Sequence, residues 1–345
     1  MALHWLDGFE SYYDQNDVNA LPNLDGGTKI SCDNTFGRFG QGMRLEWVDT
    51  YRYLAEVTGS PDTIVVGFAL KFTTAPTSFN NYDILRLLDD FNEATGNIHV
   101  RFRANGSGLI EARDSANSLL GTSSGHVIST NTWYFVEFKV YIHDSAGTIE
   151  VKVDGVTRLN LTSQDTLNGS NAYVGGVRLG NNYLNYTYMD DLYVCDTSGS
   201  SPCNDFLGDS RVDVLRPDGI GNTTQFAPSA GDNYENVDEV YPDDEATYND
   251  GDLAEKDTYQ LSDLSALGTT IYGSKSQITV RKTDAGSRKV KVVTRSNITD
   301  YLGDEKILSD TFQTFTKLYE NNPDDAAAWE EADLNGSEVG VLVSA

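Results

Sequence analysis

The sequence is poor in the residues on which metalloenzymes and membrane proteins depend. Among 345 residues there are only three cysteines and four dispersed histidines, with no Cys-x-x-Cys motif, so no zinc site is expected. No run of about 18 apolar residues occurs, so no membrane insertion is expected. The N-terminus has no basic segment before its short apolar stretch, which predicts synthesis in the cytoplasm without a signal peptide.

Positive charge is scarce as well. The chain has 25 Lys and Arg against 52 Asp and Glu, a formal net charge of -27. A surface this negative repels phosphate backbones, which excludes nucleic acid as an expected partner. It favours divalent cations as companions, and adaptation to a salty medium is an alternative explanation of the same charge.

Glycine and aromatic residues are plentiful, and their pattern is typical of strands joined by tight turns. There are 31 glycines and 19 tyrosines. Segment 63–72 is almost wholly apolar, while 97–103 and 133–142 alternate apolar and polar residues. Segment 148–153 is followed by the hairpin turn Asp154-Gly155. These strands predict a two-sheet β-sandwich.

Four segments of the first half carry a resemblance. They are Phe39-Gly-Gln-Gly-Met-Arg-Leu45, Trp133-Tyr-Phe-Val-Glu-Phe-Lys-Val140, Gly147-Thr-Ile-Glu-Val-Lys-Val-Asp-Gly155 and Tyr188-Met-Asp-Asp-Leu-Tyr-Val194. In this order they resemble the concanavalin A-like lectin/glucanase jelly roll in its laminin-G-like form. The resemblance covers residues 1–195 and implies a fold shared by sugar binders, glycan-cleaving enzymes and spacer modules.

The second half carries a different resemblance. Its matching residues include Asn204-Asp-Phe-Leu-Gly-Asp209, Arg281-Lys-Thr-Asp-Ala-Gly286 and Asn322-Pro-Asp with Ala328-Trp329. Together they resemble the C-terminal half of a family of tailed-phage virion structural proteins. The resemblance implies a location on a virion rather than an activity. We therefore expect an all-β chain of two β-sandwich domains in series: a jelly roll over 1–196, a linker over 197–208 and a virion-anchoring β-rich domain over 209–345.

The carboxylates do not match a glucanase. That chemistry on this fold needs two carboxylates on one strand, about 5 Å apart across the scissile bond. Glu137 stands alone in its strand, and Asp190 and Asp191 are expected to point to opposite faces of theirs. We therefore predict that the chain is not an enzyme and that it has no catalytic residues.

Two binding sites are predicted in the jelly roll. The resemblance implies that the first and last strands are neighbours, which would bring Asp7 and Glu10 near Asp190 and Asp191 as a calcium site. The alternative is that these carboxylates accept hydrogen bonds from loop amides. A candidate glycan site comprises Asn182, Tyr183, Tyr186 and Tyr188. The alternative is that these alternating tyrosines only cover a sheet.

The cysteines leave one question open. Cys32 lies in an expected strand and is predicted to be a buried thiol. Cys195 and Cys203 flank a short loop that a disulfide is able to close, and the sequence does not decide whether they are linked.

The leading hypothesis is a non-enzymatic structural component of a phage virion, a capsid decoration or tail protein. It would dock on other virion proteins, associate with identical chains and project the lectin-like domain. The alternative is an adhesin that binds a host surface glycan, and a third hypothesis is a glycan depolymerase. No cofactor is expected other than Ca²⁺ at the carboxylates named above.

Overall fold

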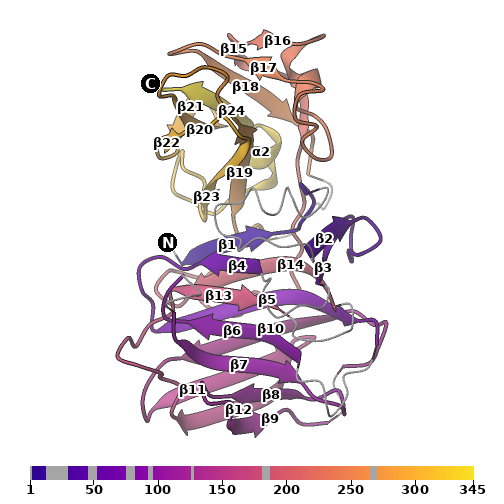
Figure 1. Cartoon of the computed structure of the whole chain (residues 1–345), viewed down its shortest axis with the longest axis vertical. Coiled ribbons are helices and arrows are strands. Elements are labelled where there is room, and N and C mark those ends of the chain that lie inside the picture. The colour runs from indigo at the N-terminus through magenta and orange to yellow at the C-terminus, as the bar shows by residue number, and fades with distance from the viewer. Residues whose placement is uncertain are drawn as a thin grey trace. The chain divides into compact units, whose positions relative to one another are not determined.

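The computed structural model describes residues 2–12, 30–45, 53–74, 82–91, 96–125, 128–180, 187–264 and 270–345. The chain divides into two compact units, and the boundary between them falls between Val212 and Asp213. Each unit is built almost entirely from antiparallel strands (Figure 1). The prediction of an all-β chain is confirmed.

The first unit contains two sheets. Sheet A has eight strands, in the order β12 (Val156–Gln164), β11 (Gly147–Val153), β10 (Tyr134–Tyr141), β5 (Thr63–Phe72), β14 (Thr187–Asp196), β3 (Gly42–Leu45) and β2 (Ile30–Asp33), with β1 (Leu3–Asp7) also paired to β14. Sheet B has six, in the order β4 (Tyr53–Glu56), β13 (Gly176–Leu179), β6 (Tyr82–Leu88), β7 (Ile98–Ala104), β8 (Ile110–Arg113) and β9 (Leu119–Thr122). The pairing of β1 with β14 is the neighbourhood of first and last strands that the resemblance implied.

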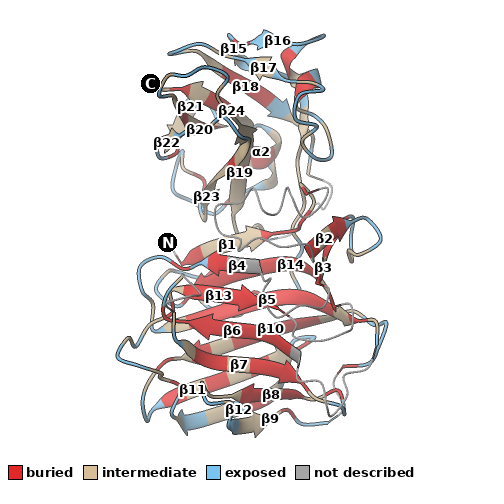
Figure 2. Cartoon of the chain, in the orientation of Figure 1, coloured by how far each residue is buried: buried red, intermediate tan, exposed pale blue. Residues whose placement is uncertain are grey.

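The core of the first unit lies between the two sheets. Successive side chains of a strand point to opposite faces, so alternating apolar residues gather on one side. Val100 and Phe102 of β7 are fully buried, and the ring of Phe102 lies 4.5 Å from that of Phe138 on β10. Figure 2 shows this burial along the central strands of both sheets. Strand β5 is apolar on both faces, and all its residues from Ile64 to Leu70 are buried, as its run of apolar residues predicts.

The hairpin between β11 and β12 forms where the sequence predicts it. Asp154 and Gly155 both have positive φ, 50° and 73°, as the two central residues of a type I′ turn require. The register places Val153 opposite Val156 across this turn. The alternation of Gly147–Val153 then puts Ile149 and Val151 in the core.

A buried pair attaches the expected linker to the first unit. Tyr193 on β14 donates a 2.6 Å hydrogen bond to Glu137 on β10. Glu137 also accepts from the amide of Gly208, and the Tyr193 hydroxyl accepts from the amide of Leu207. Because burial makes such contacts costly to lose, residues 205–208 are part of the jelly-roll unit rather than a free tether.

The second unit is smaller and is also all-β. Sheet C runs in the order β15 (Pro217–Thr224), β18 (Lys256–Leu261), β24 (Glu338–Val343), β20 (Lys289–Ser296) and β21 (Thr299–Leu302), with β22 (Lys306–Ile307) also paired to β20. Two further pairs are β19 (Ser274–Val280) with β23 (Gln313–Tyr319) and β16 (Ala227–Pro228) with β17 (Asn249–Asp250). Its core is a cluster around Val290, Val341 and Val343, against which Ile278 and Phe315 of the β19–β23 pair are packed.

Helix is minor in the described residues. A 3₁₀ turn spans Asn233–Asn236, and the only α-helical segment there is α2 (Glu331–Asn335). In the same residues, no helix has the length and apolar character needed to span a membrane. Cys32 is a buried thiol as predicted, and Cys195 and Cys203 are likewise buried thiols that are not linked by a disulfide.

Candidate functional site

The four predicted calcium ligands lie near the β1–β14 edge, and each accepts hydrogen bonds from the chain. Asp7 accepts from the amide of Phe9 and from the Tyr12 hydroxyl, both at 2.9 Å. Glu10 accepts from the amide of Gln41 at 2.9 Å. The described residues contain no group of three or more His, Cys, Asp or Glu placed to hold a metal ion. Calcium binding here stays a prediction.

Asp190 and Asp191 do not alternate across the strand as expected. A bulge interrupts the pairing of β14 with β5 at this point, and Asp191 has a φ of 55°. Both carboxylates therefore contact Arg38: Asp190 accepts from its amide at 2.7 Å, and Asp191 pairs with its guanidinium at 2.8 Å. The expectation of opposite faces is wrong because one extra residue resets the period of two.

Burial dominates the electrostatics of this aspartate pair. Burial and the neighbouring Asp191 together raise the pKa of Asp190 to about 8, against the hydrogen bonds that it accepts from the backbone amides of Arg38, Asp191 and Phe39. Burial also raises the pKa of Asp191, against the opposing effects of the Val212 amide and Arg38. Asp190 and Asp191 together fix the position of Arg38. Arg38 also pairs with Asp209 and donates a hydrogen bond to the carbonyl of Ser210.

The predicted glycan site falls partly outside the described residues. Asn182, Tyr183 and Tyr186 lie there, and only Tyr188 is described. The Tyr188 ring packs 5.1 Å from that of Phe36, and the ammonium of Lys71 lies 4.7 Å from its centre. Tyr188 therefore covers sheet A, in agreement with the alternative considered for it.

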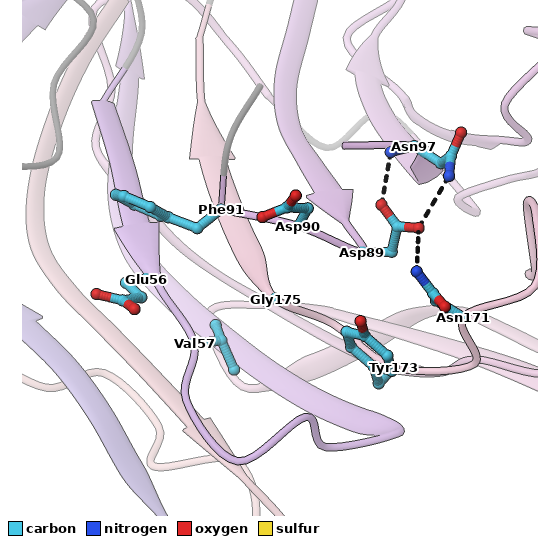
Figure 3. Close-up of a pocket in the computed structure, with 9 residues that line it drawn as sticks. All are labelled: Glu56, Val57, Asp89, Asp90, Phe91, Asn97, Asn171, Tyr173 and Gly175. Atoms are coloured by element: carbon cyan, nitrogen blue, oxygen red, sulfur yellow. Dashed lines mark hydrogen bonds between the residues drawn. The ribbon is translucent and has the colours of Figure 1, made fainter. Parts of the chain in front are cut away.

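A pocket lies at one end of sheet B, where β4 and β6 end and where β7 and β13 begin (Figure 3). Its volume is about 380 Å³. The lining combines carboxylates, amides and two aromatic rings: Glu56, Val57, Asp89, Asp90, Phe91, Asn97, Asn171, Tyr173 and Gly175.

Asp89 fixes the polar wall of this pocket. Its side chain is buried and accepts three hydrogen bonds. One comes from the backbone N–H of Asn97 at 2.6 Å, and the other two come from the side-chain amides, Asn97 Nδ2 at 2.9 Å and Asn171 Nδ2 at 3.0 Å. Since each amide uses its NH₂ group on Asp89, each turns its oxygen away from Asp89, as Figure 3 shows. The result is two amide oxygens held in defined positions.

A glycine permits this close packing. The amide of Gly175 donates to the carbonyl of Leu88 and its carbonyl accepts from Val57, both across strand ends. A Cβ at Gly175 would lie 2.6 Å from the carbonyl oxygen of Asp89. Any larger residue would push the start of β13 away from Asp89 and open the pocket.

The rim of the pocket is chemically mixed. Glu56 and Asp90 are exposed, whereas Phe91 and Tyr173 are half-buried. Carboxylates and amide oxygens accept hydrogen bonds from hydroxyl groups, and an aromatic face packs against the C–H face of a sugar ring. This combination suits a polyhydroxylated ligand.

None of these pocket residues was predicted from the sequence. A local signal exists in Leu87-Leu-Asp-Asp-Phe91, a strand that ends in two acids and an aromatic residue. Asn171, which donates a hydrogen bond to Asp89, lies 82 positions further along the chain. Asp89 and Asn171 meet only because β6 pairs with β13.

Comparison with known proteins gives similar folds only. No protein-family model matches the sequence, and no curated protein matches it. Among solved structures, the alginate lyase Aly36B is 11% identical, with 55% of this chain and 96% of that chain covered and a TM-score of 0.41. The catalytic domain of a glycoside hydrolase family 131 protein from Coprinopsis cinerea is 13% identical (61% and 99% covered, TM-score 0.39). A protein of unknown function with a galectin-like fold from Bacillus subtilis is 12% identical (56% and 96%, TM-score 0.40).

These matches correct one prediction. The sequence led us to predict that the chain is not an enzyme, and that statement is withdrawn because the matching structures include a lyase and a glycoside hydrolase. The missing pair of carboxylates is evidence against the one glucanase mechanism considered above. It is no evidence against other reactions. At these identities the likeness shows the fold, and no activity is carried over from it.

Proposed function

We propose that the first unit binds a carbohydrate in the pocket at the end of sheet B. The observation that carries the proposal is the lining of this pocket, in which the side-chain amides of Asn97 and Asn171, both held by Asp89, stand together with exposed carboxylates and two aromatic rings. Preformed polar groups next to apolar surface are the usual make-up of a small-molecule site.

The geometry indicates how a sugar would be held. The amide oxygens of Asn97 and Asn171 would accept from two ring hydroxyls, and the exposed carboxylates of Glu56 and Asp90 from others. Tyr173 or Phe91 would pack against the ring. Because Asp89 already orients the amides, little conformational entropy is lost when the sugar binds.

The test is a glycan array probed with the intact chain, followed by calorimetry on the best ligand. Tyr173→Ala and Asn171→Ala should each weaken binding by about 10-fold, the effect of losing a packing surface or a buried hydrogen bond. Tyr141→Ala, in which a half-buried tyrosine of sheet A is truncated, is the matched control. Binding that survives both pocket variants would refute the proposal. The same mixtures, followed for shortening of the polymer, report any cleavage.

A role on a virion remains a second proposal, with one structural observation in its favour. Two large apolar residues are exposed beside β20 of sheet C: Ile298, in the turn before β21, is 78% exposed, and Ile307 of β22, near the other end of β20, is 68% exposed. Such residues are suited to contact with another protein, here another virion component or a second copy of the chain. Peptides of this chain in purified particles would support the role, and their absence would refute it.

A further inference from the structure

A buried histidine holds the segment that forms one wall of the pocket. Residues 165–175 connect β12 to β13 without helix or strand, and they carry Asn171 and Tyr173 of the lining (Figure 3). His99 of β7 is 1% exposed. Its Nδ1 accepts a hydrogen bond from the backbone N–H of Asn168 at 3.0 Å, and its Nε2 lies 2.9 Å from the carbonyl oxygen of Tyr173. One imidazole ring therefore binds both ends of the stretch 168–173.

These two contacts fix the protonation state of the ring. A backbone N–H only donates a hydrogen bond, and a carbonyl oxygen only accepts one. Nδ1 of His99 is therefore without a proton, and Nε2 carries a proton and donates it to the carbonyl of Tyr173. The ring is neutral in this arrangement, because an imidazolium would set a second donor against the N–H of Asn168.

His99 reaches this position through an irregularity in sheet B. Leu87 of β6 lies opposite Val100 of β7, whereas Leu88 lies opposite Ile98. His99 is thus an extra residue in the register of these two strands. An extra residue of this kind changes the direction of a side chain in a strand, which places the ring against the segment rather than in regular alternation.

The charges around His99 come from three elements. Asp89 follows β6, Arg101 stands two positions along β7, and the segment itself carries Asp165. Burial lowers the pKa of His99 below its ordinary 6.5, against hydrogen bonds to two carbonyls of the segment and the charge of Asp89. The neutral ring that the contacts require is therefore the form that the site favours at neutral pH.

We propose that His99 is a positioning residue of the pocket, and that its protonation in acid releases the segment 168–173 and weakens carbohydrate binding. The inference rests on the proposed carbohydrate site and adds its regulation by pH. A proton on Nδ1 removes the hydrogen bond from Asn168, so the stretch that carries Asn171 and Tyr173 loses an anchor. The wall is held above about pH 6.5 and is released as pH falls through the lower pKa of His99 in the fold.

The first measurement needs no carbohydrate. NMR of the intact chain with isotope-labelled histidine should show a neutral His99 with its proton on Nε2 at about pH 7.5, and protonation of Nδ1 in acid. Hydrogen exchange, corrected for the intrinsic effect of pH, should speed up by about 10-fold or more at residues 168–173 between about pH 7.5 and about pH 5, and should stay slow in β10. A charged ring at neutral pH, a proton on Nδ1 there, or unchanged exchange at 168–173 would each overturn the proposal.

The second measurement is calorimetry with the tightest-binding oligosaccharide of the glycan array, across the same range of pH. Wild-type binding should weaken by at most about 10-fold per pH unit below the pKa of His99, the limit for one linked proton. His99→Gln offers one acceptor and one donor and does not titrate, so it should bind within about three-fold of wild type at neutral pH and show a flatter profile. His143→Gln is the matched control, because this ring is 39% exposed and accepts from the amides of Ser145 and Ala146. Its profile should follow wild type.

The outcomes keep the two proposals apart. The pocket carboxylates are present in wild type and in His99→Gln, so the difference between their profiles reports His99. Parallel profiles would overturn the role of His99 and leave the carbohydrate site standing. Absence of binding to every glycan at neutral pH would refute the site itself, and NMR and hydrogen exchange would still decide whether acid releases the segment. Both measurements on wild type also decide the proposal if His99→Gln does not fold.

Discussion

Arg86 and Arg101 lie directly opposite each other on neighbouring strands, and one buried carboxylate, Asp83, holds them in place. Like charges in facing positions repel, so this pair costs stability unless a counter-charge compensates. Asp83 also pairs with Arg103, so this one buried carboxylate compensates the repulsion within a group of three arginines on the same face of sheet B.

Asp83→Asn should be strongly destabilising. It leaves the buried Arg86 and Arg103 without their counter-charge, a change that costs about 3–5 kcal/mol in the free energy of unfolding. Urea denaturation measures the loss. Asp144→Asn removes a carboxylate that is 70% exposed and should change stability by less than about 1 kcal/mol. Equal effects from the two substitutions would contradict the compensating role of Asp83.

Gly67→Ala should disrupt the centre of sheet A. The Cβ of any residue at position 67 would overlap the ring of Tyr193, which the Glu137 hydrogen bond holds in place. Overpacking of this kind costs about 1–3 kcal/mol. Gly59→Ala is not a suitable control because Gly59 has positive φ, so Ala69→Gly, which creates space on the same strand, serves as the comparison. A Gly67→Ala protein as stable as wild type would show that Tyr193 is free to move.

Tyr193→Phe should release the segment around Leu207. The hydroxyl is the acceptor for the Leu207 amide and the donor to Glu137, and the buried partners would be left unsatisfied at a cost of about 1–3 kcal/mol. Hydrogen exchange should speed up at residues 205–208 more than in β10. Unchanged exchange there would mean that other contacts hold this segment to the jelly roll.

Stability should fall as pH rises between about 4 and about 8, through Asp190. Its pKa is about 8 in the folded chain against 3.8 for the ordinary side chain, so the folded state binds the proton that the unfolded state has lost. The contribution is complete below pH 4 and is lost as pH rises towards 8, by on the order of 1 kcal/mol per pH unit at most. Asp190→Asn cannot titrate and should flatten this part of the profile. Parallel profiles for the two proteins would show that Asp190 is ionised in the fold.

Strands were predictable where their period was regular. Segments 63–72, 133–142 and 148–153 were expected as strands, and β5, β10 and β11 form there because alternating or continuous apolar residues must reach the core. The bulge at Asp190 was not predictable, because the residues around it carry no sequence signal for an extra, unpaired residue in the strand. The four calcium candidates were chosen because the first and last strands of this unit were expected to be neighbours, and β1 and β14 are paired. Calcium binding there stays a prediction, and Asn182, Tyr183 and Tyr186 of the glycan site lie outside the described residues.

The pocket and the alignment of arginines on one face of sheet B both depend on pairings between distant strands. Arg86, Arg101, Arg113 and Arg178 each stand next to an apolar residue in the sequence, and this pattern alone says only that they point away from the core. Their alignment follows from the order β13-β6-β7-β8, which single-strand patterns do not contain. The same order joins Asp89 to Asn171.

The most direct test of the central claim is hydrogen exchange of the intact chain with and without a saturating oligosaccharide from the glycan array. If sheet B holds the carbohydrate site, protection should concentrate in the segments around Asp89 and around Asn171 to Gly175, and Tyr173→Ala should need about 10-fold more oligosaccharide to reach the same protection. Protection centred on Tyr188 and sheet A, or none in sheet B, would contradict the account.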